Sequence, residues 1–146
     1  MDKFALSLLV HTAATWVMVG IMWFVQTVHY PLYRKIHEGF VSYERCHLRR
    51  AAWLMGPVMI VEVITALFLI GLSPSAVLTK LASINFVLLI LIWVSTCLFQ
   101  VQQHQMLSIR FSRKIHHNLL NTNWVRTALW TARGILVLVM LGLFVF

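Results

Sequence analysis

Four long apolar stretches recur along the chain, separated by shorter polar segments. They cover residues 4–28, 51–72, 77–99 and 123–146, and few strongly polar residues interrupt them. A membrane-spanning helix needs about 20 mostly apolar residues, and only helices or closed barrels satisfy their backbone in lipid. The alternating ten-residue segments of a barrel do not occur. The pattern therefore predicts an all-α, antiparallel four-helix bundle in a membrane, with helices over about 4–33, 43–72, 76–107 and 122–146.

Composition and charge add an orientation to this bundle. The chain is 60% hydrophobic and 11% charged, whereas soluble domains are about 45–50% apolar and 25% charged. Basic residues gather in segments 34–50 and 110–114, while the opposite end carries only Lys3 and Lys80. Short basic loops stay in the cytoplasm, so we expect one domain (1–146) in a bacterial inner membrane with both termini outside. The net charge of +8 is expected to meet lipid headgroups, not nucleic acid.

Polar side chains inside the apolar stretches follow one face of each predicted helix. They recur at steps of three and four residues, which is the spacing of a single helix face. Because polar groups in lipid are costly, these four faces should turn toward each other inside the bundle, where they mark candidate sites. The residues are His11, Thr15, Gln26 and His29; Glu44, His47 and Glu62; Gln100, Gln103 and His104; and Asn123, Arg126, Trp130 and Arg133.

The deepest charges are expected near the membrane midplane. Glu62 and Arg133 each lie about 15 Å into their helices at a rise of about 1.5 Å per residue. An isolated charge at that depth is expensive, so the spacing predicts a Glu62–Arg133 ion pair or a polar ligand shared by the two. His11 stands alone in the outer half, with Lys80 and Asn85 as its candidate neighbours.

A second polar layer is expected closer to the basic loops. Neutral imidazoles can ligate transition metals or haem iron, and Glu44 and His47 have the i, i+3 spacing that di-iron bundles use twice. We therefore hypothesise haem b or a transition metal, with His29 and His104 binding haem and His29, His47, His104 and Glu44 binding a metal. The alternative that His29, His47 and His104 only hydrogen-bond to Gln100, Gln103 and Tyr30 stays open. The histidines of the predicted loops are expected to be solvated: His37, His116 and His117.

These residues favour a membrane redox protein, an oxidoreductase or oxygenase with its site between the helices near the cytoplasmic side. Arg126 and Arg133 would hold an anionic group, and Glu62 would relay protons, so these three are the candidate catalytic residues. A cofactorless oxygenase or quinone-binding protein, a small transporter or channel, and an assembly subunit remain alternatives. The expected partners are the lipid bilayer, a hydrophobic small molecule or quinone, and further copies of the chain.

Two segments carry a resemblance to HemJ/CopD-like four-helix membrane proteins. The run YERCHLRR at 43–50, followed by GPVM at 56–59, resembles the entry to the second helix of that family. His11 and Lys80 also stand where the family has a histidine and a lysine. The resemblance implies a haem-binding protoporphyrinogen oxidase in which His11 and Lys80 bind the cofactor or take part in catalysis.

Two other motifs resemble a different four-helix family, the anthrone-oxygenase-like membrane proteins. The sequence HYPLY at 29–33 is similar to a motif that follows the first helix there, and NWVRT at 123–127 is similar to a motif of the fourth helix. Members of this family include cofactorless oxygenases of aromatic polyketides. This resemblance implies an oxygenase that needs neither metal nor haem.

Overall fold

The computed structural model describes residues 2–146, and it is helical almost throughout. Four continuous helical spans, Lys3–Lys35, Phe40–Gly71, Ala76–Leu107 and Arg113–Val145, are each long and apolar enough to cross a membrane. They contain the helices α1 (Lys3–Phe24), α2 (Tyr30–Leu32), α3 (Phe40–Gly71), α4 (Ala76–Ser95), α5 (Val101–Leu107) and α6 (Arg113–Val145).

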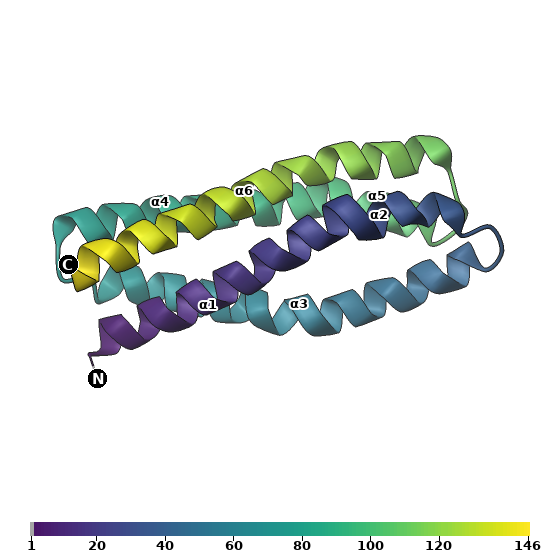
Figure 1. Cartoon of the computed structure of the whole chain (residues 1–146). Helices are drawn as coiled ribbons and strands as arrows, with labels where there is room; N and C mark the ends of the chain where they lie inside the picture. The colour runs from purple at the N-terminus through teal and green to yellow at the C-terminus, as the bar shows by residue number, and fades with distance from the viewer. Residues whose placement is uncertain (1) are drawn as a thin grey trace.

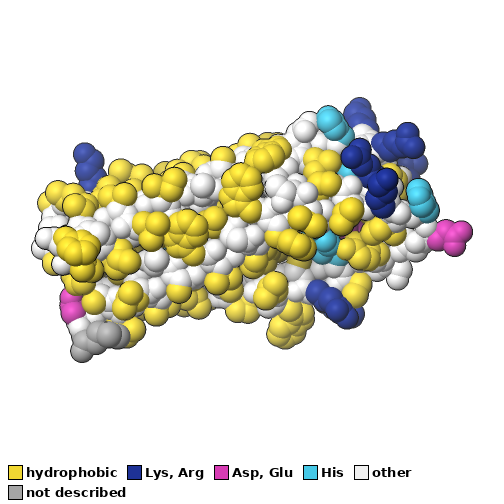
Figure 2. Space-filling view, viewed as in Figure 1, with side chains coloured by type: hydrophobic (Ala, Val, Ile, Leu, Met, Phe, Trp, Pro, Cys, Tyr) yellow, Lys and Arg dark blue, Asp and Glu magenta, His cyan; other side chains and the backbone are white. Residues whose placement is uncertain are grey.

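The spans run antiparallel and side by side, with both chain ends at one end of the bundle (Figure 1). The connections from α2 to α3 and from α5 to α6 lie together at the opposite end. Lys and Arg side chains gather at that end, and apolar side chains cover the length of the visible surface (Figure 2). The predicted all-helical, four-helix arrangement is confirmed by these four spans.

The fourth helix begins earlier than predicted. It starts at Arg113, not near residue 122, and the Ser112 hydroxyl caps it by accepting from the Ile115 N–H. The first turns of this helix are polar, so hydropathy alone does not detect them. Ser before a helix is a common N-cap because its oxygen satisfies a free backbone N–H. The second helix likewise starts before its predicted boundary, at Phe40 after Gly39 in the left-handed conformation (φ 73°).

Two π-helical turns interrupt the first and third spans near the loop end of the bundle. They cover Val25–His29 and Thr96–Gln100. Pro31 follows the first turn closely, and because proline lacks a backbone N–H it removes one donor from the regular helical ladder. A π-helical turn inserts a residue and shifts the helix face that follows, and such turns are frequent at functional sites. Tyr30 and His104, which follow the two turns, belong to the candidate site described below.

Three apolar clusters fill the bundle from end to end. The cluster nearest the termini includes Phe4, Leu69 and Met140, and the middle cluster includes Met22 and Leu89. The cluster nearest the loops contains two tyrosines among apolar residues: Val25, Tyr30, Tyr33, Phe40, Leu107 and Leu119. The buried polar groups are therefore set among apolar layers, which leaves them little access to water.

Helices α1 and α6 approach each other closely at Gly134. A Cβ atom there would lie 3.1 Å from Val19 Cγ2 and 3.5 Å from the Trp16 ring. Gly134→Leu is therefore expected to lower the free energy of unfolding by about 1–3 kcal/mol, the usual effect of overpacking. Gly142→Leu is the matched control, because nothing lies within 4 Å of a Cβ at Gly142. Unfolding of both variants in detergent micelles checks this, and equal stability would contradict the close approach.

Candidate functional site

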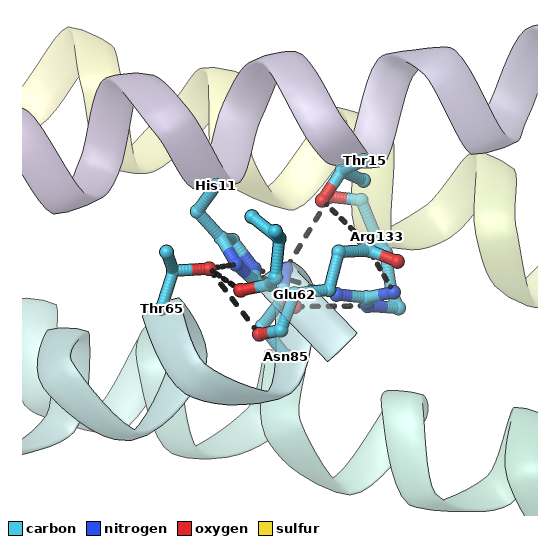
Figure 3. A network of polar contacts seen from close by, with 7 residues as sticks. His11, Thr15, Glu62, Thr65, Asn85 and Arg133 are labelled. Carbon is cyan, nitrogen blue, oxygen red and sulfur yellow. Dashed lines mark hydrogen bonds and ion pairs between the residues drawn. The ribbon is translucent and has the colours of Figure 1, made fainter. Parts of the chain in front are cut away.

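A closed polar network joins all four spans in the middle of the bundle (Figure 3). Arg133 Nη1 lies 2.9 Å from Glu62 Oε1, and both side chains are fully buried. Thr15 donates its hydroxyl to the same carboxylate oxygen at 2.8 Å. The guanidinium carbon of Arg133 lies 4.6 Å from the Trp130 ring centroid, a cation–π contact. The predicted Glu62–Arg133 ion pair is confirmed.

His11 is a member of this network. The Thr65 hydroxyl donates to the Val61 carbonyl at 2.7 Å, so its oxygen accepts from His11 Nδ1, also at 2.7 Å. The other ring nitrogen, Nε2, then accepts from Arg133 Nη2 at 3.3 Å. Asn85 Oδ1 accepts from Arg133 Nε at 2.9 Å. Both nitrogens of His11 are thus engaged within the bundle.

Lys80 does not take part in this network. Its side chain is exposed on α4, whereas His11 is fully buried. Of the two neighbours expected for His11, Asn85 is present and Lys80 is not. A cofactor site shared by His11 and Lys80, as the HemJ/CopD-like resemblance implies, is not supported by these positions.

A second buried network lies nearer the loop end and links Glu44, His104 and Tyr30. Glu44 Oε1 makes a short contact with His104 Nδ1, and His104 Nε2 lies 2.8 Å from the Tyr30 hydroxyl. A carboxylate only accepts hydrogen bonds, so Nδ1 donates to Glu44; when the ring is neutral, Nε2 accepts from the Tyr30 hydroxyl. In this neutral form, the carboxylate orients the imidazole so that the Nε2 lone pair faces the phenol proton. This is the arrangement by which an imidazole acts as a general base.

The remaining two histidines of the predicted layer pair with each other. His29 Nε2 lies 3.0 Å from His47 Nδ1, and the ring centroids of His47 and His104 are 5.8 Å apart. The structure thus brings together the histidines that the sequence predicts to share a layer. Gln100 and Gln103 instead hydrogen-bond to the Thr122 hydroxyl.

The donors of this layer do not form a metal site. Within residues 2–146, no group of three or more His, Cys, Asp or Glu side chains is positioned to hold one metal ion. Both nitrogens of His104 are engaged by Glu44 and Tyr30, so His104 offers no free nitrogen to an iron. The predicted metal site at His29, His47, His104 and Glu44 is not supported, and the residues do not fit haem iron held by His29 and His104.

Arg126 is the cation of the second network. Its Nη1 donates to Asn123 Oδ1 at 3.2 Å, and Asn123 donates in turn to Gln26 at 2.8 Å. Arg126 Nε is buried and has no hydrogen-bond partner. In the described part of the chain, no carboxylate lies at ion-pair distance from Arg126. A buried guanidinium with an unused donor favours a negatively charged or carbonyl oxygen as its partner.

Two cavities next to α3 are lined partly by residues of this network. One of about 260 Å³ lies between α3 and the α1–α2 span, and one of about 320 Å³ lies between α3 and the α4–α5 span. We call them the two lobes of the Tyr30 cavity, because the same five residues line both: Tyr30, His47, Ala51, Met55 and Arg126.

The two lobes differ in their remaining lining. The first lobe adds His29 and the exposed apolar side chains Phe24 and Leu54. The second lobe adds His104, Gln100 and the exposed Val101. Each lobe therefore combines polar groups inside the bundle with an apolar border on its lateral surface.

Sequence reasoning missed the role of one residue of this site and the burial of another. Tyr30 is expected only as a hydrogen-bond partner of the histidines, a contact that His104 makes at 2.8 Å, and not as a residue that lines a cavity. His116 was expected in a solvated loop, but it is buried on α6, and its Nε2 donates to the Tyr30 carbonyl at 2.7 Å. Because α6 begins at Arg113, His116 belongs to a helix and faces inward.

The predicted residues thus fall into two groups and one outlier. The middle network holds His11, Glu62 and Arg133. The loop-end network holds His29, Glu44, His47, His104 and Arg126, and Lys80 lies outside both.

No family model, curated protein or solved structure matches the chain. The interpretation of the site therefore rests on its own geometry.

Proposed function

We propose that this chain is an integral membrane protein whose Tyr30 cavity binds an amphipathic aromatic molecule with an ionisable oxygen, of the quinol or phenol class. The observation that carries the proposal is the buried, unpartnered Nε of Arg126 in a cavity that also contains the Tyr30 hydroxyl. Ligand sites are typically apolar hollows with a few convergent polar groups. The Tyr30 cavity has this character.

The apolar border of the cavity supports entry of the ligand from the bilayer. Phe24 and Leu54 at the border of the first lobe are more than half exposed, and in a membrane they would face lipid. A ring could pass between α3 and its neighbours while a hydrocarbon tail stays among the lipid chains. Its oxygen would then meet Arg126 and Tyr30 at the inner wall.

The residues of the site would exchange a proton with such a ligand. The ligand hydroxyl would give its proton to the Tyr30 oxygen as the Tyr30 proton moves to His104 Nε2. The resulting imidazolium would be stabilised by the Glu44 carboxylate on Nδ1, and the ligand oxyanion by the Arg126 guanidinium. This transfer leaves the total charge of the site unchanged.

The redox step of a membrane oxidoreductase or cofactorless oxygenase would follow from this proton transfer. Loss of two electrons and a second proton converts a quinol to a quinone and requires an external electron acceptor. Oxygenation of a phenolate requires dioxygen. In both cases the chain's own residues would contribute binding and proton transfer, and no step uses a metal or haem.

Membrane insertion with both basic loops in the cytoplasm is part of the proposal. The basic residues at the loop end support this orientation by the positive-inside rule. A periplasmic alkaline phosphatase reporter fused after Phe146 is expected to be active, and a green fluorescent protein fused there is expected to be dark. The opposite pair of results would reverse the proposed orientation.

Binding of a quinone-class probe tests the proposed function. Decylubiquinone and a long-chain alkylphenol are titrated against purified protein in neutral detergent, with intrinsic tryptophan fluorescence as the readout. Tyr30→Phe keeps the ring but removes the hydroxyl, so binding should weaken by about tenfold, the usual effect of one lost hydrogen bond. Tyr43→Phe is the matched control, because Tyr43 is exposed and does not line the Tyr30 cavity.

Two outcomes would overturn the proposed function. One is the absence of saturable binding of either probe by the unmodified protein. The other is the same loss of affinity in Tyr30→Phe and Tyr43→Phe. Circular dichroism of each variant confirms that its helices are intact.

A further inference from the structure

A separate hollow lies at the basic end of the bundle. It has a volume of about 790 Å³ and shares no lining residue with the Tyr30 cavity. One wall comes from the end of the first span and the turn after it, and the other from the start of α6 and the residue before its cap. We call it the basic cavity; its lining residues are Arg34, Ile36, His37, Phe111, Arg113, His116, His117 and Leu120.

The lining of the basic cavity is cationic and contains no carboxylate. Arg34 and Arg113 come from opposite walls, and three histidines complete the polar lining. Glu38 stands next to His37 in sequence but does not line the cavity. Both guanidinium groups are exposed and have no carboxylate partner among the described residues, so both are available to pair with an anion.

Two further features point to an anion in this hollow. His116 is buried and lines the cavity; its Nε2 donates to the Tyr30 carbonyl, and its Nδ1 donates to an anion when the ring carries a second proton. The N-terminus of α6, a helix of 33 residues, lies in the same wall. The partial positive charge of a helix N-terminus favours anions.

We propose that the basic cavity binds a phosphate group, carried either by an anionic phospholipid or by a soluble phosphate. A guanidinium group can bind two phosphate oxygens at once, and Arg34 and Arg113 offer one such group on each wall. The volume exceeds that of a bare ion, and Ile36, Phe111 and Leu120 supply apolar contacts for the rest of the ligand. This site is independent of the ligand proposed for the Tyr30 cavity.

Two double variants distinguish phosphate binding in the basic cavity from phosphate binding by the general positive charge of the loops. Arg34→Gln with Arg113→Gln removes two cations from the lining. Lys35→Gln with Lys114→Gln removes two cations from the adjacent positions, which are exposed and do not line the cavity. The arginine pair is expected to weaken phosphate binding by about tenfold or more, and the lysine pair by less than about twofold, as weak surface electrostatics predict.

Two probes distinguish the sources of the phosphate. Native mass spectrometry of detergent-purified protein measures retention of phosphatidylglycerol against phosphatidylcholine, and calorimetry measures binding of inorganic phosphate. Selective phosphatidylglycerol retention that the arginine pair abolishes supports a lipid headgroup, and phosphate binding that the arginine pair abolishes supports a soluble source. Equal loss in both double variants, or no binding of either probe, overturns the proposal.

Discussion

Arg133→Met is expected to lower the free energy of unfolding by about 3–5 kcal/mol, because it leaves the Glu62 carboxylate buried without its cation. Glu62 is fully buried, and apart from Arg133 its hydrogen-bond partner is the Thr15 hydroxyl. The mutation also removes the donor to Asn85 and leaves a hydrophobic side chain of similar length. Equilibrium unfolding in mixed micelles, titrated with a denaturing detergent, measures the change.

The double variant Glu62→Met/Arg133→Met separates an ion pair from two independent polar residues. Replacing a buried pair by apolar side chains is often close to neutral, whereas removing one partner is not. The double variant should therefore be more stable than either single variant, which requires a coupling energy larger than the loss of about 3–5 kcal/mol expected for Arg133→Met alone. Arg110→Met, at an exposed position, is the control and should unfold like the unmodified protein. Additive single effects would contradict the ion pair.

Ala51→Trp is expected to weaken ligand binding by about 100-fold or more, the largest effect on binding among these variants. Ala51 lines both lobes of the Tyr30 cavity, so an indole at this position occupies the space proposed for the aromatic ring. The side chain grows into a hollow, not into packed core, and the overpacking that destabilises filled cores is therefore avoided. The decylubiquinone titration measures the change.

Ala14→Trp is the matched control for this substitution. Ala14 lines a different, apolar hollow between α1 and α3 that contains none of the residues of the Tyr30 cavity. Ala14→Trp adds the same side-chain volume on the same pair of helices, α1 and α3, and should leave decylubiquinone affinity unchanged. Equal losses in Ala51→Trp and Ala14→Trp would show that the helix pair, and not the cavity, is disturbed.

The sequence was informative wherever hydropathy or helical spacing decides the structure. The length of the apolar stretches alone predicts the four spans, because in lipid the backbone N–H and C=O groups must hydrogen-bond within a helix. The spacing of polar residues predicts which side chains face inward, and the cost of a lone charge in lipid predicts that Glu62 and Arg133 pair. That pair is present at 2.9 Å.

The sequence was less informative where hydrogen-bond direction or a helix boundary decides the structure. The layer of His29, His47, His104 and Glu44 forms as predicted, but ring orientation directs the nitrogens toward each other and toward Tyr30. Spacing does not determine ring orientation, so it suggested a metal site. The burial of His116 follows from a polar helix turn that hydropathy cannot detect.

The implied role of Lys80 lacks support in the structure for a different reason. It rested on a matching residue type at a similar position, not on a helix face. Lys80 lies early in α4 with its side chain exposed, and a lysine near a helix end can extend toward the membrane surface. Helix-face position separates it from His11, which the 3.6-residue period places inside the bundle.

Photolabelling tests the central claim, a ligand in the Tyr30 cavity, most directly. A quinone carrying a photoactivatable group is cross-linked to the purified protein, and the labelled peptides are mapped by mass spectrometry. The account predicts label on the two walls of the cavity, around Met22–Tyr30 and His47–Met55, and its loss in Ala51→Trp but not in Ala14→Trp. Label spread over the lateral surfaces of all four spans, or unchanged in Ala51→Trp, would contradict it.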